Sequence, residues 1–259
     1  FRTQNRGGRG LKGVTTKSED TPQLIAACFS KDRLLIFTDQ GRVYGMKAWE
    51  TPLGSRQSRG SHIRNLLESL REDENIVSIL PVSRELLEEP DDHYLLFATR
   101  LGLIKKTALS EYVRINRNGK YALRFKIEGD SLVNVRSATN DHDIVMISTT
   151  GYASRFSCGD IRASGRVSGG VYGIKVGDRK GSGGGIVAGM VAMLSADEYI
   201  LTISKYGMAK RSRLGTAEKI HDTDASGAPK FEDDGSPKMV TDGYRRTKPG
   251  AKGVRTCLL

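Results

Sequence analysis

The chain has 259 residues, 37% of them apolar and 30 of them glycine, and its formal net charge is +11. This length and apolar content can bury a sizeable core, and a basic chain of this kind favours a polyanionic partner. The longest apolar stretch, residues 185–194, is too short to span a bilayer and no basic amphipathic helix is visible, so a membrane partner is not expected.

The positive charge is distributed unevenly along the chain. Residues 68–92 carry nine acidic and two basic side chains, and residues 216–242 carry seven acidic and three basic ones. The remaining segments are therefore more basic than the net charge indicates, which is the pattern expected of a protein that binds a nucleic-acid backbone.

Four hairpins are predicted in chain order, each with an apolar strand, a polar turn that ends in glycine, and a second strand with lysine or arginine. The turn glycines are separated by 61, 49 and 56 residues, near the repeat length of propeller-like blades, so each repeat must contain further strands. Glycine suits these turns because they need a positive φ. The hairpins lie at residues 34–47, 94–107, 144–156 and 199–211, with Gly41, Gly102, Gly151 and Gly207 in their turns.

The further strands are predicted at residues 76–82, 121–125, 132–135, 171–174 and 186–194. Four strands per repeat are enough for a blade, and radial repetition protects the strand edges. The predicted fold class is therefore all-β, a propeller-like ring of four-stranded blades formed by a single domain over residues 1–259. Two segments depart from this pattern and are not expected in the core: residues 68–92, with a helical turn near 85–89, and residues 216–242, a flexible acidic insertion.

A second recurrent element places arginine or lysine beside glycine. It is clearest at residues 4–10 and recurs more weakly at residues 56–60, 117–120, 165–170 and 245–253. Glycine lets a loop backbone approach a phosphate closely, and arginine donates a fork of hydrogen bonds to phosphate oxygens. Because the element recurs with the repeat, we interpret it as a phosphate contact rather than a means of reading bases.

Residues 4–10 resemble the box Gln-Arg-Arg-Gly-Gly-Lys/Arg-Gly that marks the C-terminal domain of the DNA gyrase A subunit. Asn5 stands where that family commonly has arginine, and Arg2 lies close enough to replace the missing cation. Residues 41–44, 76–82, 105–107, 129–130 and 165–174 also fit the order of blades in that family. The C subunit of topoisomerase IV has a related domain, usually with a degraded box, so gyrase is preferred.

The resemblance implies a β-pinwheel that wraps duplex DNA without sequence specificity, with six blades in the intact domain. This chain would then start inside one blade and end inside another. The resemblance also implies a partnership with the rest of gyrase A and with gyrase B in an A2B2 enzyme that introduces negative supercoils. The catalytic tyrosine and the ATP and Mg²⁺ sites would lie outside this chain, which would need no cofactor of its own, in a cytoplasmic, chromosome-associated enzyme.

The predicted DNA contacts come from the matched box, its weaker copies and the basic second strands of the hairpins. No catalytic or metal-binding residue is predicted. The predicted contacts are Gln4, Arg6, Gly7, Gly8, Arg9, Gly10, Arg56, Arg59, Lys105, Lys106, Arg117, Lys120, Arg155, Arg166, Lys210, Arg211, Arg245, Arg246, Lys248 and Lys252.

Several other patterns favour structural roles. Residues 183–188 match Gly-x-Gly-x-x-Ala without a βαβ unit, and residues 222–233 imitate a calcium loop without flanking helices. No histidine has a convincing nucleophile beside it, so a self-contained hydrolase is not favoured. The alternative function is a propeller that holds proteins, with incidental charge. Trp49 is expected to pack between blades, Tyr94, Tyr112 and Tyr199 to lie in the core or at blade edges, and Cys28, Cys158 and Cys257 to be small apolar packing residues of a cytoplasmic protein.

Overall fold

The computed structural model describes residues 23–55, 58, 60–177, 185–224 and 226–256. Nearly all regular elements in these ranges are strands. The exceptions are one short α-helix, α1 (Arg84–Glu88), at the predicted helical turn, and four 3₁₀ turns, η1 (Ala48–Glu50), η2 (Ile63–Asn65), η3 (Leu109–Tyr112) and η4 (Cys158–Asp160). No helix in the described ranges is long and apolar enough to cross a membrane.

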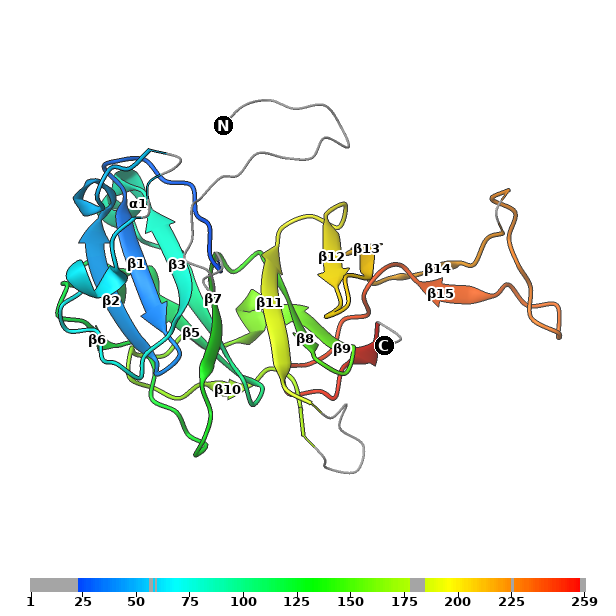
Figure 1. Ribbon diagram of the computed structural model, residues 1–259. Helices are drawn as coiled ribbons and strands as arrows, with labels where there is room; N and C mark the ends of the chain where they lie inside the picture. Colours follow the sequence, from blue (N-terminus) through cyan, green and yellow to red (C-terminus); the bar gives the residue numbers. More distant parts are fainter. Residues whose placement is uncertain (1–22, 56–57, 59, 178–184, 225, 257–259) are drawn as a thin grey trace.

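Three antiparallel sheets of four strands follow one another along the chain (Figure 1). Sheet A has the order β3 (Ile76–Val82), β1 (Arg33–Thr38), β2 (Arg42–Lys47), β6 (Lys120–Tyr121). Sheet B has the order β7 (Leu132–Ala138), β4 (Tyr94–Thr99), β5 (Leu103–Ala108), β10 (Val171–Tyr172). Sheet C has the order β11 (Val187–Met193), β8 (Asp143–Ser148), β9 (Tyr152–Ser157), β16 (Val254–Arg255). The all-β fold of four-stranded blades is confirmed.

Two further pairs of strands complete the described structure. The fourth predicted hairpin is β12 (Tyr199–Ile203) with β13 (Ala209–Arg213), which pair with each other alone among the described residues. The acidic segment 216–242 forms an arm, stabilised by β14 (Lys219–His221) and β15 (Met239–Thr241), that projects from the sheets (Figure 1). The flexibility expected for this arm stays a prediction.

The blades are interlocked rather than built from one repeat each. In every sheet the fourth strand comes from the segment that follows the next hairpin: β6 pairs with β2, β10 with β5, and β16 with β9. We call β6, β10 and β16 the donated strands. They form one edge of each sheet, while β3, β7 and β11 form the opposite edge and pack side by side (Figure 1). The expectation that one repeat supplies a whole blade is therefore wrong.

The core consists of layers between successive sheets, because strands such as β4 are buried on both faces. Leu95 and Phe97 pack toward sheet A, whereas Leu96 and Ala98 pack toward sheet C. Neighbouring residues of a strand point to opposite faces, so burial of both faces explains the continuous apolar runs of the first three hairpins. In the fourth hairpin most of β12 is exposed. The acidic segment 68–92 is not excluded from this core, since it contains β3 and the buried Leu70 and Glu74.

Some predicted side-chain positions are confirmed and others are wrong. Tyr112 and Cys158 are buried in the core, as expected. Cys28 is exposed, so it is not the predicted small apolar packing residue. Trp49 is 62% exposed, with the Lys47 ammonium 5.8 Å from its ring centroid, so it does not pack between blades. Cys257 and part of the predicted Gly-x-Gly-x-x-Ala loop lie outside the described residues.

The turn glycines have the positive φ predicted for them, with φ of 75°, 91°, 78° and 84° at Gly41, Gly102, Gly151 and Gly207. Close approach of the donated segment adds a second requirement. The Gly102 carbonyl accepts hydrogen bonds from the amides of Gly173 and Ile174, at 2.9 and 3.2 Å. A Cβ at Gly102 would collide with the Ile174 carbonyl oxygen.

Gly102→Ala is therefore expected to lower the free energy of unfolding by about 2–3 kcal/mol, because the alanine meets both backbone strain and a collision. Gly207→Ala is the matched control: it has the same place in its hairpin and a positive φ, but nothing lies within 4 Å of its added Cβ. Its expected cost is about 1 kcal/mol. Urea denaturation measures both, and equal losses would contradict the role of the donated segment.

Candidate nucleic-acid interface

The glycine and cation elements precede the donated strands. Each element has a glycine with positive φ directly before the donated strand, at 72° for Gly119, 76° for Gly170 and 86° for Gly253. The next residue begins the donated strand at the same register, with Lys120 opposite Val43, Val171 opposite Ile104, and Val254 opposite Ala153. We call the segments 112–119, 163–170 and 246–253 the box loops. One box loop therefore lies at the donated-strand edge of each sheet.

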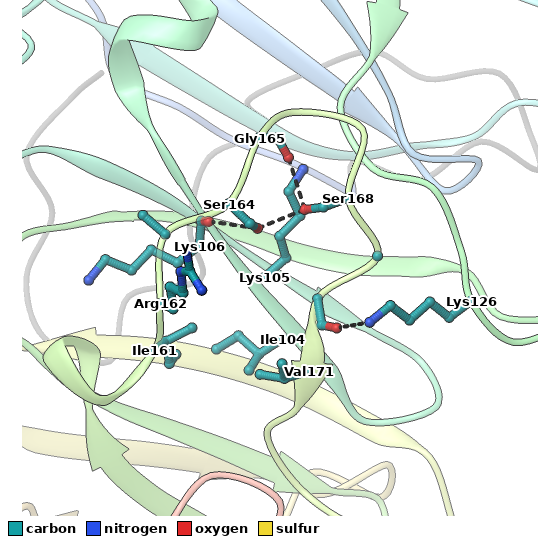
Figure 2. A pocket seen from close by; sticks show the side chains of 13 residues that line it. Ile104, Lys105, Lys106, Lys126, Ile161, Arg162, Ser164, Gly165, Ser168 and Val171 are labelled. Atoms are coloured by element: carbon teal, nitrogen blue, oxygen red, sulfur yellow. Dashed lines mark hydrogen bonds between the residues drawn. The ribbon is translucent and has the colours of Figure 1, made fainter.

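The box loop 163–170 borders a cavity of about 520 Å³ (Figure 2). The Ser164 amide donates to the Lys106 carbonyl at 2.9 Å, and the Ser164 and Ser168 hydroxyls lie 2.7 Å apart. The glycines allow this close packing, because a Cβ at Gly170 would collide with the Ile104 carbonyl. The loop backbone is thus held against strand β5.

Two cations that were not predicted from the sequence line this cavity. The Lys126 ammonium donates to the Gly170 carbonyl at 2.5 Å, and Arg162 is exposed beside the loop (Figure 2). Together with the hydroxyls they surround the hollow with donors suited to a phosphate group. Neither residue lies inside a glycine and cation motif. Arg162 lies just before the motif at residues 165–170, which could have indicated it, whereas Lys126 is distant from that motif in the sequence and reaches it only in the folded chain.

The box loop 246–253 repeats the same backbone attachment in sheet C. The Thr247 amide donates to the Arg155 carbonyl at 2.6 Å, as Ser164 does to Lys106. Parallel bridges pair Lys106 with Ala163 and Arg155 with Arg246 at matching positions. Exposed cations are numerous here: Arg245, Arg246, Lys248 and Lys252.

The other predicted cations are mostly exposed and have local partners. Arg117 forms an ion pair with Glu50 at 3.0 Å, and Lys120 donates to the Arg114 carbonyl at 3.2 Å. Arg166 is partly buried and donates from Nε to the Tyr121 carbonyl at 3.1 Å. Lys210 and Arg211 are exposed on β13. Gln4, Arg6, Gly7, Gly8, Arg9, Gly10, Arg56 and Arg59 lie outside the described residues.

Three of the predicted DNA contacts need correction. Lys105, Lys106 and Arg155 are only 1%, 4% and 2% exposed, so their side chains do not reach a surface where DNA could lie. Their charges are satisfied inside: Lys105 donates to the carbonyls of Ala122 and Arg166, and Arg155 pairs with Asp143. A buried cation must find such partners, because burial without them costs several kcal/mol.

Lys105 supports the box loop 163–170 of its own sheet through the Arg166 carbonyl, and its pKa is strongly shifted. Burial, followed by the positive charge of Arg166, lowers the pKa of Lys105 to about 7. Between pH 7 and the ordinary lysine range near pH 10 the unfolded chain then binds more protons than the folded chain. The stability contribution of Lys105 therefore rises as the pH rises through this window.

We expect the free energy of unfolding of the wild type to increase relative to Lys105→Met between pH 7 and pH 9, by up to about 1.4 kcal/mol per pH unit. Urea denaturation at the two pH values measures the difference. Lys120→Met, which removes an exposed lysine, serves as the control and should show no such divergence. Parallel behaviour of wild type and Lys105→Met would contradict the lowered pKa.

Comparison with known proteins gives consistent similarities. The family model described as "DNA gyrase C-terminal domain, beta-propeller" matches residues 1–21, 32–83, 93–139 and 142–182. The DNA gyrase A subunit of Deinococcus deserti is 41% identical over 218 residues, which cover 83% of this chain and 26% of that protein. The gyrase A subunit of Staphylococcus epidermidis is 39% identical over 213 residues, which cover 82% and 23%. The chain thus spans about a quarter of the length of these relatives.

Solved structures with a similar fold include two kinds of C-terminal domain. That of DNA topoisomerase IV gives a TM-score of 0.62 at 23% identity, covering 87% of this chain and 58% of that one. That of DNA gyrase A gives a TM-score of 0.58 at 17% identity, covering 96% and 89%. At these identities the likeness concerns the fold.

Proposed function

This chain belongs to the DNA gyrase C-terminal domain family, and we propose that it binds duplex DNA along its donated-strand edges and bends it from sheet to sheet. The observation that carries the proposal is the recurrence of the box loop, once per sheet, at the same edge and register. A duplex that follows this edge meets cations at regular intervals.

The contacts are directed at the DNA backbone rather than at the bases. Glycine loops, serine hydroxyls and flexible lysines match phosphate oxygens, whereas base reading requires side chains inserted into a groove. Bending a short duplex smoothly by 40–90° costs on the order of 1–6 kcal/mol, which several phosphate contacts can offset. Binding should therefore depend little on sequence.

The proposed role in the larger protein follows from the relatives, which are about four times as long as the matched segment. In that role the chain serves the gyrase A subunit of a type IIA topoisomerase and acts with gyrase B in an A2B2 enzyme. Strand cleavage and the use of ATP and Mg²⁺ would belong to other parts of the enzyme. A cytoplasmic, chromosome-associated location follows from this role.

Ligation of nicked DNA circles in the presence of the chain tests the proposal. We expect a shift in linking number that grows with bound protein and saturates, because a bent path fixes writhe in the closed circle. Binding isotherms at several salt concentrations should give a log–log slope near −7 if about 8 phosphates are contacted. A slope near zero with no topological shift would contradict DNA wrapping and favour a propeller that binds proteins.

A further inference from the structure

We infer that Lys106 and Arg155 are positioning residues that set the angle between neighbouring sheets, and through it the curvature of the bound DNA. The inference rests on the proposed function, since curvature matters only if DNA follows the sheet edges. It gives a role to two cations whose burial removes them from the DNA surface.

The two residues occupy equivalent places in successive hairpins. Lys106 lies opposite Leu96 in the pair β4 and β5, and Arg155 lies opposite Val145 in the pair β8 and β9. Leu96 and Val145 each pack toward the next sheet in the series. Both cations therefore project from the second strand of a hairpin toward the following blade.

Each cation reaches the same point of the next blade. Lys106 Nζ donates to the carbonyl of Cys158 at 3.0 Å and to Asn140 Oδ1 at 2.5 Å. Arg155 Nη1 donates to the carbonyls of Leu214 and Gly215 at 2.9 and 2.8 Å. Cys158 follows β9 directly and Leu214 follows β13 directly, so in both cases the acceptor is the first residue after the next hairpin.

The same residues also hold the box loops through their backbone. The Lys106 carbonyl accepts a hydrogen bond from the Ser164 amide, and the Arg155 carbonyl accepts one from the Thr247 amide. Both amides lie at the start of a box loop. One residue thus joins a DNA-facing loop of its own sheet to the body of the next sheet. A change in the Lys106 side chain would alter the angle between the box loops of sheets B and C, and a change in Arg155 would alter the angle between the box loop of sheet C and the hairpin of β12 and β13, which carries exposed cations. Neither change removes an exposed cation.

The equivalent place in sheet A holds no cation. Gly45 lies there, opposite Leu35, and a Cβ at Gly45 would collide with the Ile115 carbonyl of the box loop 112–119. Arg33 from β1 donates to that carbonyl, which belongs to the loop at the edge of sheet A itself. The buried cation therefore joins neighbouring blades at two junctions and has no counterpart at the equivalent place in sheet A.

The test separates DNA affinity from DNA curvature, using the whole chain and nicked circles. Lys106→Met is expected to bind DNA with the affinity and salt slope of the wild type, but to give at least a twofold smaller linking-number shift at saturation. Lys106→Arg should restore most of the shift. Lys120→Met, which removes an exposed cation of a donated strand, should instead weaken the salt slope and keep the shift at saturation.

An unchanged shift in a folded, saturated Lys106→Met variant would overturn the inference. If this variant fails to fold, Arg155→Lys provides the second test, because it keeps a buried positive charge but cannot reach the several carbonyls that the guanidinium holds. A twofold smaller shift supports the inference and an unchanged shift overturns it. Loss of folding in both variants would also overturn it, since the residues would then be fold determinants. A wild-type chain with no shift would instead refute the proposed function.

Discussion

Replacing Arg155 with methionine is expected to lower the free energy of unfolding by about 3–5 kcal/mol, because it leaves a buried carboxylate with an exposed arginine as its remaining cationic partner and leaves three carbonyls without their donor. Arg155 Nε and Nη2 donate to Asp143 Oδ2 at 2.9 and 2.5 Å. Its Nη1 donates to the carbonyls of Leu214, Gly215 and Tyr244 at 2.8–2.9 Å. The substitution removes all of these donors at once, and each unpaired buried acceptor adds to the cost.

Arg246→Met is the matched control. Arg246 donates to the same Asp143 oxygen at 3.0 Å, but its side chain is 61% exposed. Exposed ion pairs contribute little, so its expected cost is below about 1 kcal/mol. Urea denaturation of both variants measures the difference. Similar losses would show that Arg155 has no special place in joining sheet C to the base of the arm.

Replacing Arg245, Lys248 and Lys252 together with alanine is expected to reduce the magnitude of the log–log salt slope of DNA binding by about 2.7, or about 0.9 per lost phosphate contact. At 0.1 M salt this corresponds to a loss of affinity of roughly 100-fold or more. All three residues are exposed in or beside the box loop 246–253. Fluorescence titrations with a duplex at several salt concentrations measure both quantities.

The charge-matched control replaces Lys219, Lys230 and Lys238 with alanine. These lysines lie on the acidic arm, which projects from the sheets (Figure 1), and their loss changes the net charge by the same amount. The slope should stay within about one unit of the wild-type value, because counterion release follows local contacts rather than total charge. Equal effects of the two triple variants would contradict a DNA track along the donated-strand edges.

The hairpins were predictable because their information is local. Gly41, Gly102, Gly151 and Gly207 mark turns that need positive φ. The apolar runs before the first three glycines are strands buried on both faces, whereas β12, before Gly207, exposes Tyr199, Leu201 and Ile203. The repeat of these signals was enough to predict an all-β, propeller-like fold. Strand donation was not predictable, because β6, β10 and β16 are only two residues long and their partners lie in another repeat. Nothing in two residues specifies which sheet they join.

The box loops, like the sheets, were predictable from the sequence only in part. Their glycines and exposed cations, such as Lys248 and Lys252, were recognisable from composition, and the resemblance to the gyrase family rests on the copy at residues 4–10. The sequence did not distinguish Lys210, which is exposed, from Lys105 at the same place in its hairpin, which is buried. The two lysines differ in what packs against their strands, and the residue type alone does not show this.

Residue chemistry and spacing alone therefore predicted the strand pattern, the turns and the basic character of this protein, because each can be read from residues close together in the sequence, whereas the family was indicated by the resemblance of residues 4–10 to a known box. Only the tertiary structure decided which repeat completes which sheet and which cations face solvent. Both depend on contacts between segments far apart in the chain. Lys106 reaches Cys158 and Arg155 reaches Leu214 only after neighbouring sheets have packed together, so burial converts two apparent DNA contacts into connections between blades.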